Sequence, residues 1–248
     1  MATHANPVRS GHEELRRGSF GANALVIMAK APLPGTVKTR LVPPLSHEEA
    51  AELYRCLLLD ILDGLRFFAG ADLFVAFTPA VSAPVFQELV PPGFVCFPQR
   101  DGDLGHRMHS VFVDLSDGGY KSIVLIGSDL PVFPIRFLQE AFAMLERSRR
   151  DLVLGPSRDG GYYLIAMGRS IPEIFKGIPW GEENVLAVTL QKISSLGLKA
   201  YLLPTWFDID IPEDLRYLES VTDQFAACSQ SKTLAFLKCR VSALLKEL

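Results

Sequence analysis

Short apolar runs alternate with segments of helical periodicity along most of this chain. Strands are expected at residues 24–29, 72–77, 94–97, 121–127, 151–154, 162–167 and 199–203. Helical spacing of apolar residues is found at residues 46–68, 81–89, 104–115, 134–147 and 182–196, and again after residue 212. Uncharged runs of this length suit strands that are buried on both faces, and their alternation with helices is typical of βαβ units. The pattern therefore predicts an α/β fold with a mostly parallel sheet.

Polar residues mark the start of the first helix. Glu49 follows Ser46 at the spacing of a capping box, in which the side chain of each residue bonds to the backbone N–H of the other. We expect this helix to begin at Ser46 and to run to Phe68.

The two ends of the chain differ from its centre. Residues 1–22 are polar and are expected to form a flexible leader, followed by one domain over residues 23–222. Residues 223–248 are expected to form an amphipathic helix, because apolar residues recur there at alternating spacings of three and four. These residues are Leu234, Leu237, Val241, Leu244 and Leu248. We expect this stripe to pack on the domain, and a homodimer contact is the alternative.

Composition narrows the class of protein. The chain has 248 residues, of which 48% are hydrophobic and 21% are charged, an ordinary globular balance. The net charge of -3 argues against a nucleic-acid surface. The four cysteines show no CxxC spacing, so neither a zinc site nor a disulfide framework is indicated, and a reducing cytoplasm is the expected location. The polar start and the absence of an apolar run of about 18 residues argue against secretion and membrane insertion.

A cationic loop follows the first predicted strand. Residues 29–41 read AKAPLPGTVKTRL and carry Lys30, Lys38 and Arg40, while Gly35 allows the backbone to approach a ligand closely. Ligands of open α/β sheets lie beyond the carboxyl ends of the strands, so this loop is placed to face the site. The pattern indicates binding of a polyphosphate; solvated surface cations are the alternative.

Carboxylates follow two other segments. Asp129 comes directly after the apolar run 121–127, where an aspartate either caps the next helix or binds a hard cation such as Mg²⁺. Asp208 and Asp210 alternate in FDIDIPEDL, which places them on the same side of an extended segment. Asp214 has a sufficient explanation in the first turn of the helix that begins near Pro212, whereas Asp208 and Asp210 have none.

Two glycine-rich segments are further candidates. In QRDGDLGHRM, the backbone around Gly102, Asp103 and Gly105, together with Arg107, is suited to hold a base, ribose or phosphate; a turn capped by Asp103 is the alternative. In GPSRDGGYY, the residues Asp159, Gly160, Gly161 and Tyr162 are suited to close approach and stacking on a sugar, or form a simple hairpin turn. Trp180 in the GIPW turn is an aromatic residue that is equally compatible with core packing.

Several common catalytic motifs are missing. Gly35 and Lys38 do not have the GK spacing of a Walker loop, and no GxGxxG follows the first strand. The sequence also lacks a GxSxG elbow, so acyl transfer has no visible nucleophile.

Six motifs in register carry a resemblance to a known family. They are AKAPLPGTVKTRL, GDLGHRM, GSDLP, GPSRDGGYYLIA, GIPW and FDIDIPEDL, between residues 24 and 215. In this order they resemble a bacterial glycosyltransferase-like family of the nucleotide-diphospho-sugar transferase superfamily. Its members are similar to phospholactate guanylyltransferase, and some are associated with arsenosugar pathways. The resemblance implies a glycosyltransferase A-type fold, a three-layer Rossmann-like sandwich with a mostly parallel mixed sheet.

The resemblance also implies roles for individual residues. It assigns Lys38 and Arg40 to phosphates, Asp129 to Mg²⁺ (or Mn²⁺), and Asp210 to the same metal as its second carboxylate. The GDLG turn would contact the nucleotide or the acceptor, and the DGGYY segment would lie on the acceptor side. The chain departs from the family at His106, where an acidic or polar residue is usual, and at Leu130, where serine is usual.

These observations predict a metal-dependent transferase with a nucleotide donor and a small-molecule acceptor. Nucleotidyl transfer from a triphosphate is favoured by the three cations of the first loop, whereas glycosyl transfer from a nucleotide sugar is favoured by the resemblance. A catalytically silent nucleotide-binding protein of the same fold is the alternative. Phosphoryl chemistry relies on positioning and electrostatics, so the lack of a nucleophilic triad is expected.

Overall fold

The computed structural model describes residue 15 and residues 21–147, 151–225 and 230–241. Within this part of the chain, seven strands form one sheet in the order β3-β2-β1-β4-β6-β5-β7. The strands are β1 (Asn23–Lys30), β2 (Asp72–Thr78), β3 (Phe94–Pro98), β4 (Ser122–Gly127), β5 (Leu152–Pro156), β6 (Tyr162–Met167) and β7 (Ala200–Leu202). Only β6 runs antiparallel to its neighbours, β4 and β5. The mostly parallel sheet is therefore confirmed.

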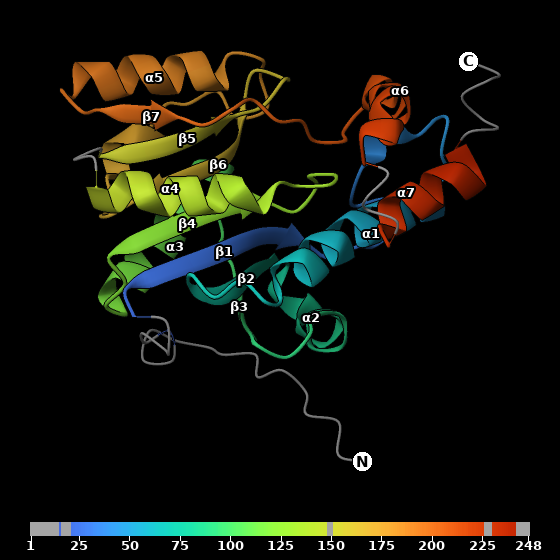
Figure 1. The fold of residues 1–248 in the computed structure, drawn as a ribbon, viewed down its shortest axis with the longest axis horizontal. Helices are drawn as coiled ribbons and strands as arrows, with labels where there is room; N and C mark the ends of the chain where they lie inside the picture. The colour runs from blue at the N-terminus through green and yellow to red at the C-terminus, as the bar shows by residue number, and fades with distance from the viewer. Residues whose placement is uncertain (1–14, 16–20, 148–150, 226–229, 242–248) are drawn as a thin grey trace.

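Helices cover both faces of this sheet (Figure 1). The α-helices are α1 (His47–Leu65), α2 (Ala83–Leu89), α3 (Leu104–Asp117), α4 (Ile135–Arg147), α5 (Val185–Ser195), α6 (Pro212–Val221) and α7 (Lys232–Phe236). Helices α1, α2 and α4 pack on one face, and α3 and α5 on the other. The predicted three-layer α/β sandwich is confirmed. No helix in the described ranges is both long and apolar enough to cross a membrane.

The parallel pairing places four loops at one edge. Lys30 at the end of β1 lies opposite Thr78 at the end of β2, and Met28 lies opposite Gly127 of β4. The loops after β1, β2, β3 and β4 therefore leave the sheet on the same side, toward which the arrowheads of β1 and β4 point in Figure 1. Gln99 links two of these strand ends, because its side-chain amide donates to the carbonyls of Ala29 and Ala76.

Helix α1 has the predicted start and an earlier end. Ser46 Oγ accepts from the N–H of Glu49 at 3.1 Å, and the Glu49 carboxylate accepts from the N–H of Ser46 at 2.9 Å, which confirms the capping box. The helix ends at Leu65 instead of Phe68, because the N–H of Phe68 turns back to the Leu65 carbonyl. Leu15, which lies within the predicted leader, is buried in the cluster that α3 shares with the sheet. The rest of residues 1–20 lies outside the described residues.

The C-terminal part packs on α1 through α7. Leu234 and Leu237 are buried in a cluster with residues of α1, as the predicted stripe requires. The described residues form helix α7, which continues directly into a π-helical segment over Leu237–Val241. Leu244 and Leu248 lie outside the described residues, and the predicted domain boundaries stay predictions.

Asp60 on α1 anchors this segment. Its carboxylate accepts from Ser231 Oγ at 2.6 Å and from the backbone N–H groups of Lys232 and Thr233 at 2.7 and 2.9 Å. Asp63, one turn further along α1, pairs with the Lys232 side chain at the surface.

We predict that Asp60→Asn lowers the free energy of unfolding by about 1–3 kcal/mol, because it places an amide group against hydrogen-bond donors. Asp63→Asn removes the same charge from an exposed pair and should cost less than about 1 kcal/mol. Urea denaturation of both variants measures the difference. Equal losses would show that Asp60 does not anchor α7.

Candidate active site at the carboxyl edge of the sheet

Lys38 lies at the centre of a cluster of charges at the carboxyl edge. Its side chain is only 5% exposed, and its Nζ lies 2.8 Å from Asp129 Oδ2 and 3.6 Å from Asp210 Oδ1. Burial by itself would lower the pKa of Lys38, but the Asp129 and Asp210 carboxylates outweigh it, so the pKa lies above its ordinary value. The structure therefore brings together three residues that sequence analysis singled out separately.

The backbone of Lys38 is left-handed. Its φ of 49° and ψ of 35° place it in a region that L-residues other than glycine seldom occupy, at the start of the short 3-10 helix η2 (Thr39–Leu41). On either side, Val37 and Leu41 are buried in separate apolar clusters. The buried flanks hold the backbone of Lys38 in place, and the left-handed turn lets a basic side chain enter a largely enclosed position.

The other two predicted cations are more exposed. Arg40 donates from Nη1 to Asp210 Oδ2 at 2.7 Å, and its side chain is 67% exposed. Lys30 is exposed at the end of β1. Gly35 has a φ of 75°, a backbone conformation that favours glycine. Two of the three cations therefore face carboxylates.

Tyr54 of α1 is a structural support that sequence analysis missed. Its buried hydroxyl accepts from the N–H of Lys30 at 2.8 Å and lies 2.6 Å from Ser128 Oγ. It thereby joins the end of β1 to the residue before Asp129. Burial raises the pKa of Tyr54 to about 12, so the phenol stays protonated. The only signal in the sequence is one tyrosine on a mostly aliphatic helix face.

Asp208 lies in the same cluster but is held differently. Its Oδ1 accepts from Ser157 Oγ at 2.8 Å. Burial raises the pKa of Asp208 to about 7, and the carboxylates of Asp129 and Asp159 act in the same direction. No regular strand forms around Asp208 and Asp210, yet both carboxylates lie close enough to Lys38 to raise its pKa.

The DGG segment forms the turn of the β5–β6 hairpin, the simpler of its two interpretations. Asp159 Oδ1 accepts from the N–H of Gly161 at 2.9 Å. Gly160 has a φ of 87°, and a Cβ there would lie 1.7 Å from the carbonyl oxygen of Glu183. The turn is therefore pressed against the segment that leads into α5. The N–H of Arg158 donates to the Trp206 carbonyl, which brings Ser157 close to Asp208.

The GDLG turn is a capped helix start. Asp103 caps α3 by accepting from the N–H of His106 at 2.7 Å, and Arg107 Nε donates to the Gly102 carbonyl at 2.8 Å. The capping role considered for Asp103 is confirmed. Asp103 and Arg107 therefore use some of their hydrogen-bonding groups within the turn.

The GDLG and GIPW turns contact each other. A Cβ on Gly105 would lie 2.7 Å from the indole ring of Trp180, so this glycine permits the close contact. The Trp180 ring meets Tyr162 edge-on, with centroids 6.3 Å apart. The hydroxyl oxygen of Tyr162 is buried, and burial raises its pKa. Tyr162 and Trp180 thus form one packed unit beside the helix start that was predicted to contact the nucleotide.

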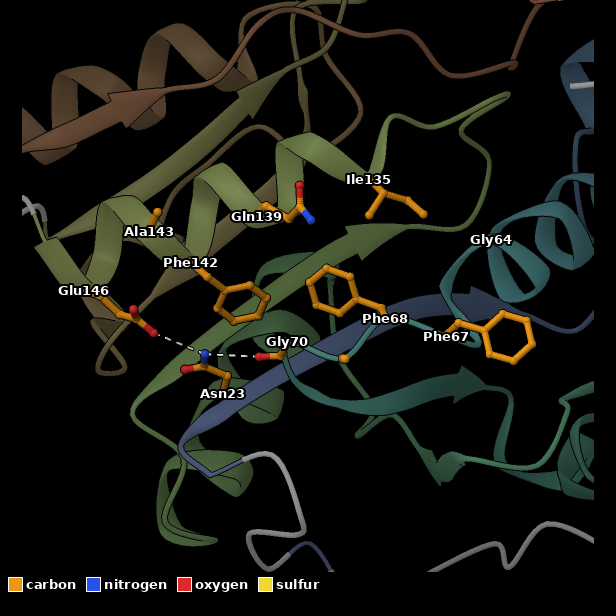
Figure 2. Close-up of a pocket in the computed structure, with 11 residues that line it drawn as sticks. Asn23, Gly64, Phe67, Phe68, Gly70, Ile135, Gln139, Phe142, Ala143 and Glu146 are labelled. Carbon is orange, nitrogen blue, oxygen red and sulfur yellow. Dashed lines mark hydrogen bonds between the residues drawn. The ribbon is translucent and has the colours of Figure 1, made fainter. Parts of the chain in front are cut away.

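A pocket of about 670 Å³ lies elsewhere, at the amino end of β1 between the end of α1 and α4 (Figure 2). The rings of Phe68 and Phe142 stack there with centroids 6.2 Å apart. Asn23 bridges the Gly70 carbonyl and Glu146 Oε1, each at 3.2 Å. The pocket shares no lining residue with the charged cluster, so the two are separate features of the fold.

We predict that Gly160→Ala lowers the free energy of unfolding by more than about 2 kcal/mol, because it adds a backbone clash to the cost of a positive φ. Gly181→Ala is the matched control: Gly181 has a φ of 91° and no atom within 4 Å of its added Cβ. The control should cost only about 1 kcal/mol. Thermal or urea unfolding compares them, and similar losses would contradict the predicted clash.

We also predict that Asp208→Asn stabilises the protein by about 1–3 kcal/mol at pH 8. The folded-state pKa lies above the unfolded value, so the stability linked to protonation of Asp208 is complete below about pH 4, decreases as the pH rises from there, and is lost above about pH 7. The gain from Asp208→Asn should therefore be larger at pH 8 than at pH 5. Urea denaturation at both pH values measures it, and a gain independent of pH would contradict the proposed burial cost.

Comparisons with known proteins place the chain among its relatives. A profile of the family described as "Uncharacterized protein conserved in bacteria (DUF2064)" matches residues 62–182. A candidate nucleotide-diphospho-sugar transferase from Desulfovibrio desulfuricans has a similar structure, with 33% identity and a TM-score of 0.82. That match covers 91% of this chain and 97% of the other. The curated proteins contain no match.

More distant structures share the fold alone. A cytidylyltransferase from Leptospira borgpetersenii is 15% identical with a TM-score of 0.55, over 90% of this chain and 96% of the other. The 4-diphosphocytidyl-2C-methyl-D-erythritol synthase from Anaerococcus prevotii is 9% identical with a TM-score of 0.53, over 82% and 98%. By the 33% identity over nearly the full length of both chains, the protein belongs to the same family as the Desulfovibrio desulfuricans protein. Its residues 62–182 match the DUF2064 profile, and it has a nucleotidyltransferase-like fold.

Proposed function

We propose that this protein is a transferase that uses a nucleotide donor together with Mg²⁺ or Mn²⁺. The observation that carries the proposal is the cluster of Lys38, Asp129 and Asp210 at the carboxyl edge of the sheet. Ligands of open α/β sheets bind beyond this edge. The fold shared with cytidylyltransferases supports a nucleotide site there.

The donor set fits a hard divalent cation. Asp129 and Asp210 come from different loops, yet one oxygen of each already faces the same positive charge, the Lys38 ammonium. Mg²⁺ commonly uses one or two protein carboxylates and completes its shell with substrate phosphates and water. A metal held by Asp129 and Asp210 would neutralise charge on the donor phosphates.

The chain's own residues position the reactants. Lys38 and Arg40 offer cations to the donor phosphates, and Lys30 extends this positive surface at the end of β1. Tyr54 fixes the first loop relative to Asp129, so the residues proposed to bind the phosphates keep their position relative to the proposed metal ligand. The packed unit of Trp180 and Tyr162, the GDLG turn and the DGG turn would border the nucleotide and the acceptor. Positioning and electrostatic stabilisation suffice for phosphoryl chemistry.

Two reactions are consistent with this site. In nucleotidyl transfer, an acceptor oxygen attacks the α-phosphorus of a triphosphate and pyrophosphate leaves; the three cations of the first loop favour this reaction because a triphosphate carries more charge. In glycosyl transfer, the acceptor attacks the sugar carbon and a nucleoside diphosphate leaves. The name of the Desulfovibrio desulfuricans relative favours the second reaction.

Thermal unfolding with each nucleoside triphosphate and nucleotide sugar tests the proposal. A donor at about 100-fold excess over its dissociation constant should raise the melting temperature by about 5–10 °C in the presence of Mg²⁺. If no donor changes the melting temperature with or without Mg²⁺, the proposal is wrong. Release of pyrophosphate or of a nucleoside diphosphate then identifies the reaction, and donor binding without either product indicates a silent nucleotide-binding protein.

We predict that Asp129→Asn removes the Mg²⁺-dependent part of this shift, because the metal loses one of its proposed carboxylates. Asp63→Asn carries the same charge change on the surface of α1 and should keep the full shift. Titration of Mg²⁺ at fixed donor concentration compares the two variants. A Mg²⁺-dependent shift that persists in Asp129→Asn would show that the metal lies elsewhere.

A further inference from the structure

The position of Lys38 raises a question that the proposed function leaves open. Its ammonium lies between Asp129 and Asp210, the two carboxylates proposed to bind the metal. The remaining oxygen of Asp210 faces Arg40. Among the described residues, each proposed metal ligand is therefore already paired with a cation of the protein.

A divalent ion and the Lys38 ammonium compete for the same charge. Any ion bound by both carboxylates would lie close to the ammonium, and like charges about 4 Å apart repel even in water. The Lys38 side chain is 5% exposed, so solvent screens this repulsion little. In the described part of the chain, no group of three or more Asp, Glu, His or Cys side chains is arranged to hold a metal ion. A metal alone therefore meets two proposed ligands that each already face a cation of the protein.

A polyphosphate changes this balance. Its oxygens offer Lys38 a stronger anionic partner and also supply ligands to the metal. The change needs only movement of the side chain, because Val37 and Leu41 anchor the backbone on either side of Lys38. The four-carbon stem of lysine allows its ammonium to move without the loop.

We propose that Lys38 is a resident counter-ion, which keeps Asp129 and Asp210 from binding a divalent cation until the phosphates of a donor draw its ammonium away. This inference rests on the proposed function. It implies that donor and metal enter together and that a metal alone binds weakly. By linkage, the donor strengthens metal binding by the same factor by which the metal strengthens donor binding.

Titration with Mn²⁺ in the absence of any nucleotide tests the counter-ion directly, with free Mn²⁺ measured by its electron paramagnetic resonance signal. Lys38→Met removes the charge without adding an oxygen ligand, and should bind one Mn²⁺ at least tenfold more tightly than the wild type, a change of about 1.4 kcal/mol. Lys38→Arg keeps the charge and should bind as weakly as the wild type. Arg55 forms a surface ion pair with Glu52, so Arg55→Met removes the same charge away from the site and controls for the effect of net charge on Mn²⁺ affinity.

Two results would overturn the counter-ion role. One is equal Mn²⁺ affinity in Lys38→Met and the wild type. The other is tight binding of one Mn²⁺ by the wild type, with a dissociation constant below about 10 μM, together with loss of this tight binding in Asp129→Asn. This second measurement needs no Lys38 variant, so it decides the matter even if Lys38→Met does not fold; weak binding, above about 1 mM, then supports the role.

The outcome is separable from that of the proposed function. If donors and Mg²⁺ bind together but Lys38→Met gains no Mn²⁺ affinity, the counter-ion role fails and the transferase proposal stands. If Lys38→Met gains the Mn²⁺ site but no donor binds to the wild type, the transferase proposal fails while the competition between Lys38 and the metal stands.

Discussion

A buried ammonium group joins three segments that are distant in the sequence. Lys38 contributes it from the loop after β1, and it meets Asp129 after β4 and Asp210 before α6. Enclosing charges in this way costs desolvation free energy, and buried ion pairs are weak sources of net stability. The ion pairs instead fix the relative positions of the three segments at the carboxyl edge, because the buried ammonium group needs carboxylates of opposite charge beside it.

The alignment depends on apolar packing behind it. A cluster away from the sheet combines Leu41 from the first loop, Phe207 and Ile209 from the segment around Asp208, and Leu234 from α7. In Figure 1, α1, α6 and α7 gather at one end of the molecule. Helix α7 thus supports the two loops that carry Lys38 and Asp210.

Local signals in the sequence predicted most of the fold. Strand and helix periods, and the capping box of Ser46 and Glu49, involve neighbouring residues, so each could be inferred without the rest of the chain. Departures occurred at helix ends, where tertiary packing decides how far a helix continues. The end of α1 at Leu65 is an example.

The sequence by itself determined the alternation of strands and helices, the cationic loop and the carboxylates that follow strands, because these depend on local patterns and on the common edge of parallel strands. The tertiary structure alone decided that Lys38 pairs with Asp129, 91 residues away, and that Asp210 joins them. It also decided that burial raises the pKa of Asp208 to about 7 and that Tyr54 braces the first loop. Distances and desolvation arise only when remote segments meet, and no local pattern encodes them.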